Sequence, residues 1–245
     1  MSRTFLLMGS GEFEPWSQEV ERVALAVAKG DGRVIVVPTA SAAEGDRVFD
    51  RWASMGLAHY EAMGVPAEVL PVKVRGDALR EDLAERVADA SMVFFSGGKP
   101  KRLAAAIVDT PVWRAVLAAI ERGAVYAGCS AGAMVASQSR DGKKRPTGSW
   151  TFGLGLVSGA SFGVHWDRVR HVPLAGRSLA ARVPEGTAFV GVDERTAILG
   201  DGRSWTVYGN GEVQVRMGKS SRSHRAGDVF ETPAPRTSDC YPWRQ

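Results

Sequence analysis

Cysteine is scarce in this sequence, since Cys129 and Cys240 are the only two among 245 residues. Two cysteines are too few for the disulfide framework of a small secreted protein or for a cysteine-rich zinc site. Long apolar runs are missing too: no stretch approaches about 18 consecutive apolar residues, so no transmembrane helix is expected. The apolar patch at 5–8 is too short for the core of a signal peptide. We therefore expect a cytoplasmic protein with no metal site and no membrane partner.

A strong charge of one sign is also missing. The 31 Lys and Arg residues nearly balance the 27 Asp and Glu residues, which gives a formal net charge of +4. No basic stripe with interleaved aromatic residues is present, so the composition does not point to nucleic acid. Apolar residues make up 44% and charged residues 24%, which excludes disorder over most of the chain. We expect a single domain over 1–217, followed by a polar tail at 218–245 that packs in part on that domain.

The first half of the sequence alternates short apolar runs with segments of helical spacing. The expected strands are 4–8, 33–37, 67–70, 92–95 and 124–127. The expected helices are 17–29, 49–63, 79–87, one starting at Pro100 and one between Thr110 and Gly123. This alternation predicts an α/β fold, a parallel sheet with helices on both faces. Ligands bind such sheets at the carboxyl ends of the strands, where the Gly-rich turns 97–98 and 128–132 lie.

The pattern changes after about residue 186. Short strands are expected at 189–192, 197–199, 205–208 and 212–215. The dipeptides Asp201-Gly202 and Asn210-Gly211 between them are typical of hairpin turns. We expect a C-terminal antiparallel extension of the same domain.

A nucleophile elbow is the clearest chemical motif. Gly128-x-Ser130-x-Gly132 lies between an expected strand and an expected helix, the context that the G-x-S-x-G pattern requires. Glycine suits both flanking positions because side chains there would collide across the sharp turn. Cys129 is the competing nucleophile, but its own flanking residues are Ala127 and Ala131. The simpler alternative is a Gly-rich turn whose serine caps a helix.

A serine nucleophile needs a base, and the base needs an acid that orients it. Of the four histidines, His59 lies in a helical pattern and His224 in the basic tail, which leaves His165 and His171. Asp193-Glu194 directly follows the expected strand 189–192 and offers two candidate acids. Ordinary surface ion pairs would explain the same residues.

Several segments together resemble one known family. They are 37–41, 63–65, 95–98, 128–133, 153–156 with His165-Trp166, and 191–197. In these segments the sequence resembles the peptidase E and cyanophycinase family of serine peptidases, whose core is similar to that of class I glutamine amidotransferases. The resemblance covers roughly residues 1–217.

By position, the resemblance implies a triad of Ser130 as nucleophile, His165 as general base and Glu194 as orienting acid, with Asp193 as the rival acid. It implies an oxyanion hole from the backbone amides of Gly98 and Ala131. The implied reaction is acyl transfer through an acyl-enzyme, with no metal and no organic cofactor. The implied partner is a small acidic, aspartyl peptide, and the family suggests a homodimer.

The sequence departs from the family around the substrate. Lys99-Pro100 follows the glycine pair, where peptidase E members usually carry Asn-Thr and cyanophycinases Asp-Gln. Lys99, Arg168 and Arg170 are candidates to bind a substrate carboxylate, because an Arg fork and a Lys charge both suit one. All three could equally be solvated surface charges. A cyanophycinase-like β-aspartyl peptidase, a hydrolase of another amide or ester, and a binding protein on the same scaffold are the alternative functions.

Overall fold

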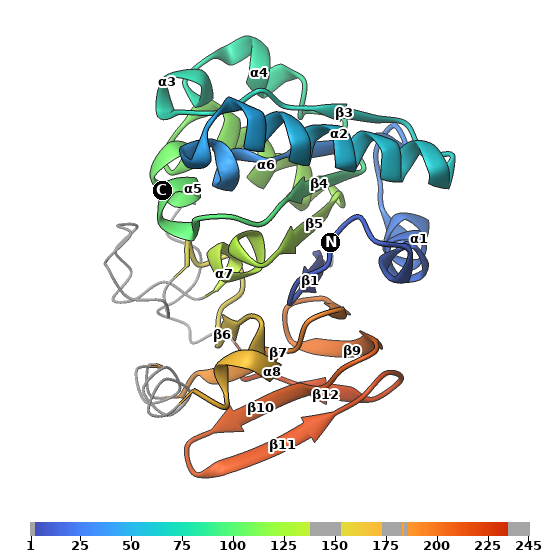
Figure 1. Ribbon diagram of the computed structural model, residues 1–245, viewed down its shortest axis with the longest axis vertical. Coiled ribbons are helices and arrows are strands. Elements are labelled where there is room, and N and C mark those ends of the chain that lie inside the picture. The colour runs from blue at the N-terminus through green and yellow to red at the C-terminus, as the bar shows by residue number, and fades with distance from the viewer. Residues whose placement is uncertain (1–2, 138–152, 173–182, 184–185, 235–245) are drawn as a thin grey trace.

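A computed structural model describes residues 3–137, 153–172, 183 and 186–234, with the two sheets and their helices drawn in Figure 1. The strands are β1 Thr4–Met8, β2 Val34–Val37, β3 Ala67–Val69, β4 Met92–Phe95, β5 Val125–Cys129, β6 Ala160–Gly163, β7 Ala188–Val192, β8 Thr196–Gly200, β9 Ser204–Gly209, β10 Val213–Met217, β11 Ser220–His224 and β12 Val229–Glu231. The α-helices are α1 Gln18–Val27, α2 Asp46–Met63, α3 Arg75–Ala78, α4 Glu81–Glu85, α5 Pro100–Ile107, α6 Pro111–Arg122, α7 Ala131–Ala136 and α8 Trp166–Val169. Two 3-10 helices, Pro15–Ser17 and Thr39–Glu44, precede α1 and α2.

The larger sheet has the strand order β12-β9-β8-β1-β5-β4-β2-β3. The five neighbouring strands β1, β5, β4, β2 and β3 pair in parallel. Beyond β1, the strands β8, β9 and β12 continue the sheet with antiparallel pairing. This mixed α/β architecture, a mostly parallel sheet flanked by helices, confirms the predicted fold class. Since β1, β5 and β4 are adjacent and parallel, their carboxyl ends and the loops that follow them meet at one edge.

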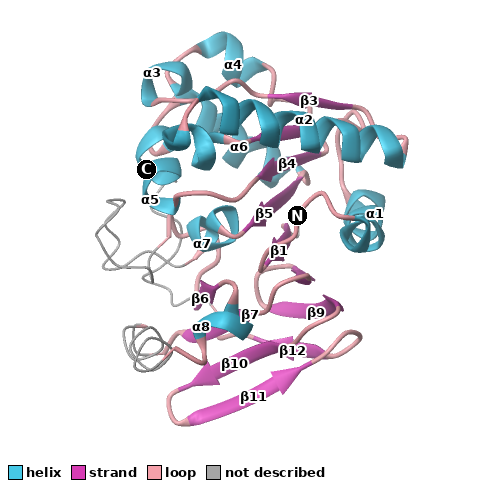
Figure 2. Ribbon diagram, in the orientation of Figure 1, coloured by secondary structure: helices cyan, strands magenta, loops and turns pink. Residues whose placement is uncertain are grey.

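Helices cover both faces of the parallel strands (Figure 2). On one face, α1 and α2 bury Val20, Ala24 and Tyr60 against alternate side chains of the strands. On the other face, α5, α6 and α7 bury residues such as Leu103 and Val116. The strands are apolar on both faces because both are covered, which explains their continuous apolar runs.

A second sheet of four strands, in the order β11-β10-β7-β6, lies beside the antiparallel end of the first. Trp205 of β9 is fully buried where the two sheets meet. Its ring centroid lies 6.3 Å from that of Phe5 in β1 and 5.7 Å from that of Phe162 in β6. One continuous apolar core therefore joins the second sheet to the face of the first that carries α7.

Two expectations about local structure are wrong. The helix expected at 79–87 is shorter than predicted: only α4, Glu81–Glu85, lies in this segment, and Leu79 and Arg80 separate it from the preceding short helix α3. The Asn210-Gly211 turn does not close a hairpin: β9 pairs with β8 and β12, whereas β10 pairs with β7 and β11. At this turn the chain crosses from one sheet to the other. The Asp201-Gly202 turn does close a hairpin, between β8 and β9.

The polar tail expected after residue 217 contains two strands. β11 pairs with β10 and β12 pairs with β9, so the sheets include the chain as far as Glu231. The end of the tail at 235–245, with Cys240, lies outside the described residues. In the part of the chain that the structure describes, no single helix is long and apolar enough to cross a membrane; α5 and α6 meet that test only as a pair bent by 95°.

Replacing Trp205 with Ala should weaken the joint between the two sheets. We expect the free energy of unfolding to fall by about 3–5 kcal/mol, because a large buried ring is lost and a cavity is left. Denaturant unfolding followed by circular dichroism measures the change. Val229→Ala on the neighbouring β12 is the control: Val229 is 61% exposed, and its loss should cost no more than about 0.5 kcal/mol. Equal effects of both variants would show that Trp205 does not join the sheets.

Candidate active site

The elbow forms where β5 ends and α7 begins. Ser130 occupies the sharp turn with φ 48° and ψ −104°, a conformation that a non-glycine residue rarely adopts. A methyl group at Gly132 would lie 2.2 Å from the carbonyl oxygen of Phe95, and one at Gly128 would lie 2.6 Å from the backbone of Gly132. Both glycines are therefore required by close backbone contact. For Gly128 the contact is across the turn, as the motif predicts, whereas for Gly132 it is with the neighbouring strand β4.

The structure brings Ser130, His165 and Glu194 together in one line of contacts. Ser130 Oγ lies 3.1 Å from Nε2 of His165, and Nδ1 of the same ring lies 2.7 Å from Oε1 of Glu194. The three residues come from different elements: the elbow, the turn between β6 and α8, and the turn between β7 and β8. His165 is itself in the left-handed region, with φ 50°. Its side chain is 38% exposed and that of Glu194 23% exposed, so the line opens to solvent at the histidine.

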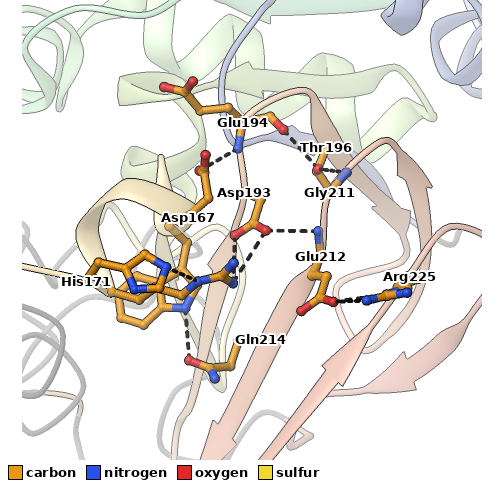
Figure 3. A network of polar contacts seen from close by, with 11 residues as sticks. Asp167, His171, Asp193, Glu194, Thr196, Gly211, Glu212, Gln214 and Arg225 are labelled. Carbon is orange, nitrogen blue, oxygen red and sulfur yellow. Dashed lines mark hydrogen bonds and ion pairs between the residues drawn. The ribbon is translucent and has the colours of Figure 1, made fainter.

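The neighbouring acid Asp193 points elsewhere, as Figure 3 shows. Its Oδ2 accepts a hydrogen bond from the Glu212 amide at 3.0 Å, and its Oδ1 lies 3.3 Å from Nη1 of Arg170. Burial raises the pKa of Asp193, against the effects of the Glu212 amide and of Arg170. Successive residues at a strand end face opposite sides, and only Glu194 of this pair contacts His165.

The other histidine candidate lies apart from this line. His171 is exposed, and its Nε2 accepts a hydrogen bond from Arg170 Nε at 3.4 Å. The structure thus groups His171 with Arg170 and Asp193.

A network of polar contacts holds the segment that carries Glu194 (Figure 3). The Glu194 amide donates to Oδ1 of Asp167 at 2.9 Å, and its carbonyl accepts from Oγ1 of Thr196 at 3.1 Å. That hydroxyl oxygen accepts in turn from the Gly211 amide at 3.0 Å. The turn at Asn210-Gly211, where the chain passes between the sheets, therefore helps to hold the segment that carries Glu194. Asp167 and Thr196 were not predicted from the sequence, although Asp167 stands only two residues after His165.

Cys129 is fully buried, and its side chain belongs to the core beneath α1 and α2. Its Sγ donates a hydrogen bond to Oε2 of Glu12 at 2.9 Å. Burial first, and then the Glu12 carboxylate, raise the pKa of the Cys129 thiol well above its usual value. A thiolate is the reactive form of cysteine, so this environment does not suit a nucleophile.

Gly98, one of the two expected oxyanion donors, lies in a turn that packs tightly against the backbone at Ala40. It has φ +138°, and a methyl group there would lie 2.4 Å from the carbonyl carbon of Ala40. The following amide, of Lys99, donates to the Ala40 carbonyl at 2.8 Å. Within the described residues, the amides of Gly98 and Ala131 donate no hydrogen bond to another group of the chain. Both amides are thus free to donate a hydrogen bond to the oxygen of an incoming substrate.

The three candidate substrate-binding cations lie in different surroundings. Lys99 is exposed and makes no ion pair in the described part of the chain. Arg168, whose side chain is 74% exposed, places Nη2 2.7 Å from Oε2 of Glu194. Arg170 pairs with Asp193. Both arginines therefore contact carboxylates of the protein itself, and among these three cations only Lys99 has no ion pair with a described residue.

No group of three or more His, Cys, Asp or Glu side chains in the described ranges is arranged to hold a metal ion.

Comparison with known proteins identifies the family. The model of peptidase family S51 matches residues 5–206. The chain belongs to peptidase family S51. Members of this family include peptidase E and cyanophycinase, so the protein is a serine-type peptidase, as the resemblance in the sequence predicted.

Individual proteins are similar to this chain in sequence or in fold. The chain is 26% identical over 235 residues to a cyanophycinase of Geminocystis herdmanii (strain PCC 6308), covering 91% of this chain and 84% of the relative. The crystal structure of a peptidase from an acI-B1 Actinobacterium is similar with a TM-score of 0.85 at 28% identity, covering 94% of this chain and 97% of that one. A putative peptidase E from Listeria monocytogenes EGD-e shares the fold, with a TM-score of 0.55 at 17% identity over 93% of this chain and 100% of that one.

Proposed function

We propose that Ser130, His165 and Glu194 are the catalytic triad of this S51 peptidase, and that its substrates are small peptides with an aspartyl carboxylate near the scissile bond. The observation that carries the triad is the unbroken line of contacts at 3.1 Å and 2.7 Å from the serine through the imidazole to the carboxylate. A base within hydrogen-bond reach of the nucleophile, itself oriented by an acid, is the arrangement that activates a serine.

The proposed reaction follows from this line. His165 Nε2 takes the proton of Ser130 Oγ while the oxygen attacks the scissile carbonyl carbon. Glu194 accepts the hydrogen bond of Nδ1–H, which leaves Nε2 free as the base and stabilises the imidazolium that forms. The imidazolium then gives its proton to the departing amine, and an acyl-enzyme remains. Water, activated by the same histidine, releases the acid and restores the serine.

The negative oxygen of the tetrahedral intermediate needs donors that are already in place. The amides of Gly98 and Ala131 are without partners in the described part of the chain. Ala131 directly follows Ser130 in the elbow, and Gly98 belongs to the glycine turn after β4. Donors that need no rearrangement stabilise developing charge more than water does. We assign the oxyanion hole to these two amides.

The preference for an acidic substrate rests on Lys99. It directly follows Gly98, the proposed oxyanion donor, and makes no ion pair with any residue that the structure describes. Arg168 already contacts Glu194, so a substrate carboxylate would have to share that guanidinium with the triad acid. Arg170 is engaged by Asp193, and we place it second to Lys99 as a substrate contact.

A cyanophycinase-like cleavage of β-aspartyl bonds is the second candidate. The observation that favours it is the matched relative from Geminocystis herdmanii, which is named as a cyanophycinase. The two candidates share the proposed triad and differ in which aspartyl linkage reaches Ser130, so a panel of α- and β-aspartyl dipeptides separates them.

Ser130→Ala and His165→Ala should each lower kcat/KM by at least about a thousandfold, because the nucleophile and its base act as a unit. For the same reason the double variant should be little worse than either single one. Steady-state hydrolysis of an aspartyl dipeptide, with circular dichroism to check folding, measures this. His171→Ala is the control and should retain most activity. Multiplicative losses in the double variant would assign His165 another role.

Glu194→Gln should reduce activity less than loss of either other triad residue, because the acid only orients and stabilises the base. Asp193→Asn should reduce it less still, since Asp193 contacts the Glu212 amide and Arg170 instead of His165. The comparison is of kcat values for the two amide variants, which change the same chemical group at adjacent positions. A slower Asp193→Asn enzyme would reverse the assignment of the acid.

A dipeptide panel tests the substrate. We expect Asp-Leu to be cleaved faster than Asn-Leu and Ala-Leu, and Lys99→Met to reduce this preference by about tenfold, the size of one charged contact at a partly exposed site. The hydrolysis of an uncharged activated ester should change little in Lys99→Met. Equal rates for the three dipeptides would remove the acidic preference and leave a serine hydrolase of another amide or ester. Failure of a fluorophosphonate probe to label Ser130 would favour a binding protein.

A further inference from the structure

A buried carboxylate lies beside the proposed active site and has no part in the triad. Glu12, in the loop after β1, is only 4% exposed. Its Oε1 accepts a hydrogen bond from the Gly97 amide at 2.7 Å, and its Oε2 accepts one from Cys129 Sγ at 2.9 Å. Glu12 thus ties the loop after β1 to the ends of the two strands β4 and β5.

Both donors stand directly before groups that the proposed reaction uses. Gly97 precedes Gly98, whose amide we assign to the oxyanion hole, and Cys129 precedes Ser130. A methyl group at Gly97 would lie 2.9 Å from Oε1 of Glu12 and 3.5 Å from Cβ of Ser130. The glycine turn therefore lies against both the carboxylate and the nucleophile.

The turn is held on both sides of Gly98. Before it, the Gly97 amide donates to Glu12, and after it, the Lys99 amide donates to the Ala40 carbonyl at 2.8 Å. The amide between them, that of Gly98, is the one left without a partner in the chain as described. With two successive glycines, the turn has little conformational restriction of its own, so its orientation depends on these two hydrogen bonds.

We propose that Glu12 is a positioning residue for the oxyanion hole. By accepting the Gly97 hydrogen bond, it fixes the peptide plane before Gly98 and keeps the Gly98 amide directed at the site of attack. A hydrogen bond to a carboxylate is stronger than a neutral one, which suits this task. The inference rests on the proposed function, because it assigns Glu12 to the oxyanion hole that this function uses.

The charge of Glu12 and its geometry have opposite effects on the reaction. A negative carboxylate close to the oxyanion would oppose the charge that develops there. If charge dominated, replacing Glu12 with neutral Gln would raise kcat. If Glu12 acts by position, the same replacement lowers kcat, because the neutral amide oxygen of Gln holds the Gly97 N–H more weakly than a carboxylate does. The direction of the change in kcat therefore separates the two effects.

A matched control exists in the same core. Glu21 of α1 is fully buried, and both its carboxylate oxygens lie 3.2 Å from Nε2 of His59 in α2. Glu21→Gln makes the same chemical change as Glu12→Gln in a buried site, but at a residue whose partner lies on a helix instead of the glycine turn. It reports what loss of a buried carboxylate does to stability alone.

The experiment measures kcat, KM and amide hydrogen exchange in the wild type, Glu12→Gln and Glu21→Gln, with an aspartyl dipeptide as substrate. For Glu12→Gln we expect kcat to fall by about 10- to 100-fold, the scale of a displaced oxyanion donor, with KM within about threefold. Exchange in the peptide covering 96–99 should become faster. Glu21→Gln should lower the melting temperature and leave kcat and the exchange at 96–99 unchanged.

Two further variants keep the test decisive. If Glu12→Gln does not fold, Glu12→Asp keeps the charge but shortens the side chain by one methylene, so the carboxylate is withdrawn from Gly97 and the same losses are expected. Cys129→Ala removes the thiol contact and leaves the Gly97 hydrogen bond in place. It should therefore lower kcat much less than either Glu12 variant.

The outcomes separate this inference from the proposed function. A folded Glu12 variant with unchanged or raised kcat, or with unchanged exchange at 96–99, overturns the positioning role while Ser130-dependent turnover of the wild type still stands. A wild type without Ser130-dependent turnover refutes the proposed function, and the role of Glu12 in an oxyanion hole falls with it. The combination of lower kcat, steady KM and faster local exchange supports the inference.

Discussion

The contact between the backbone of α7 and the end of β4 determines the geometry of the site. At Gly132 the helix approaches the Phe95 carbonyl so closely that a methyl group would lie 2.2 Å from the oxygen. Because no side chain separates them, the elbow and the glycine turn after β4 lie side by side, and a methyl group at Gly97 would lie 3.5 Å from Cβ of Ser130. Any larger residue at Gly132 would push the helix away and move Ser130, the proposed nucleophile, with it.

Much of this structure could be predicted because its signals are local. The run at 92–95 is apolar on both faces, which marks a strand covered by helices on two sides, and the structure has β4 at Met92–Phe95. The elbow carries its signal in the spacing of two glycines, and for Gly128 the steric exclusion acts across the turn itself. His165 and Glu194 were reached through the family resemblance, because no local pattern connects a histidine to an acid 29 residues later in the chain.

The features that were missed depend on contacts between distant parts of the chain. Asn210-Gly211 has the residues of a hairpin turn, but such residues serve any sharp reversal, and here the chain passes between two sheets. Glu12 has the sequence of an exposed loop acid, and only the packing of three loops buries it against Gly97, 85 positions away. The segment at 79–87 keeps helical spacing, but α4 covers only Glu81–Glu85 of it.

Left-handed backbone conformations gather at the site. Five non-glycine residues in the described chain have positive φ, and Ser130 and His165 are among them, with Phe13 next to Glu12 and Arg195 next to Glu194. Such conformations typically cost about 1–3 kcal/mol each, so the fold gives up stability at these positions. Without the proposed catalytic roles, glycine at Ser130, or glycine or asparagine at His165, would be retained for its stabilising effect. A lineage that abandoned the proposed catalysis would thus be marked by more stable descendants whose first changes lie at these two positions.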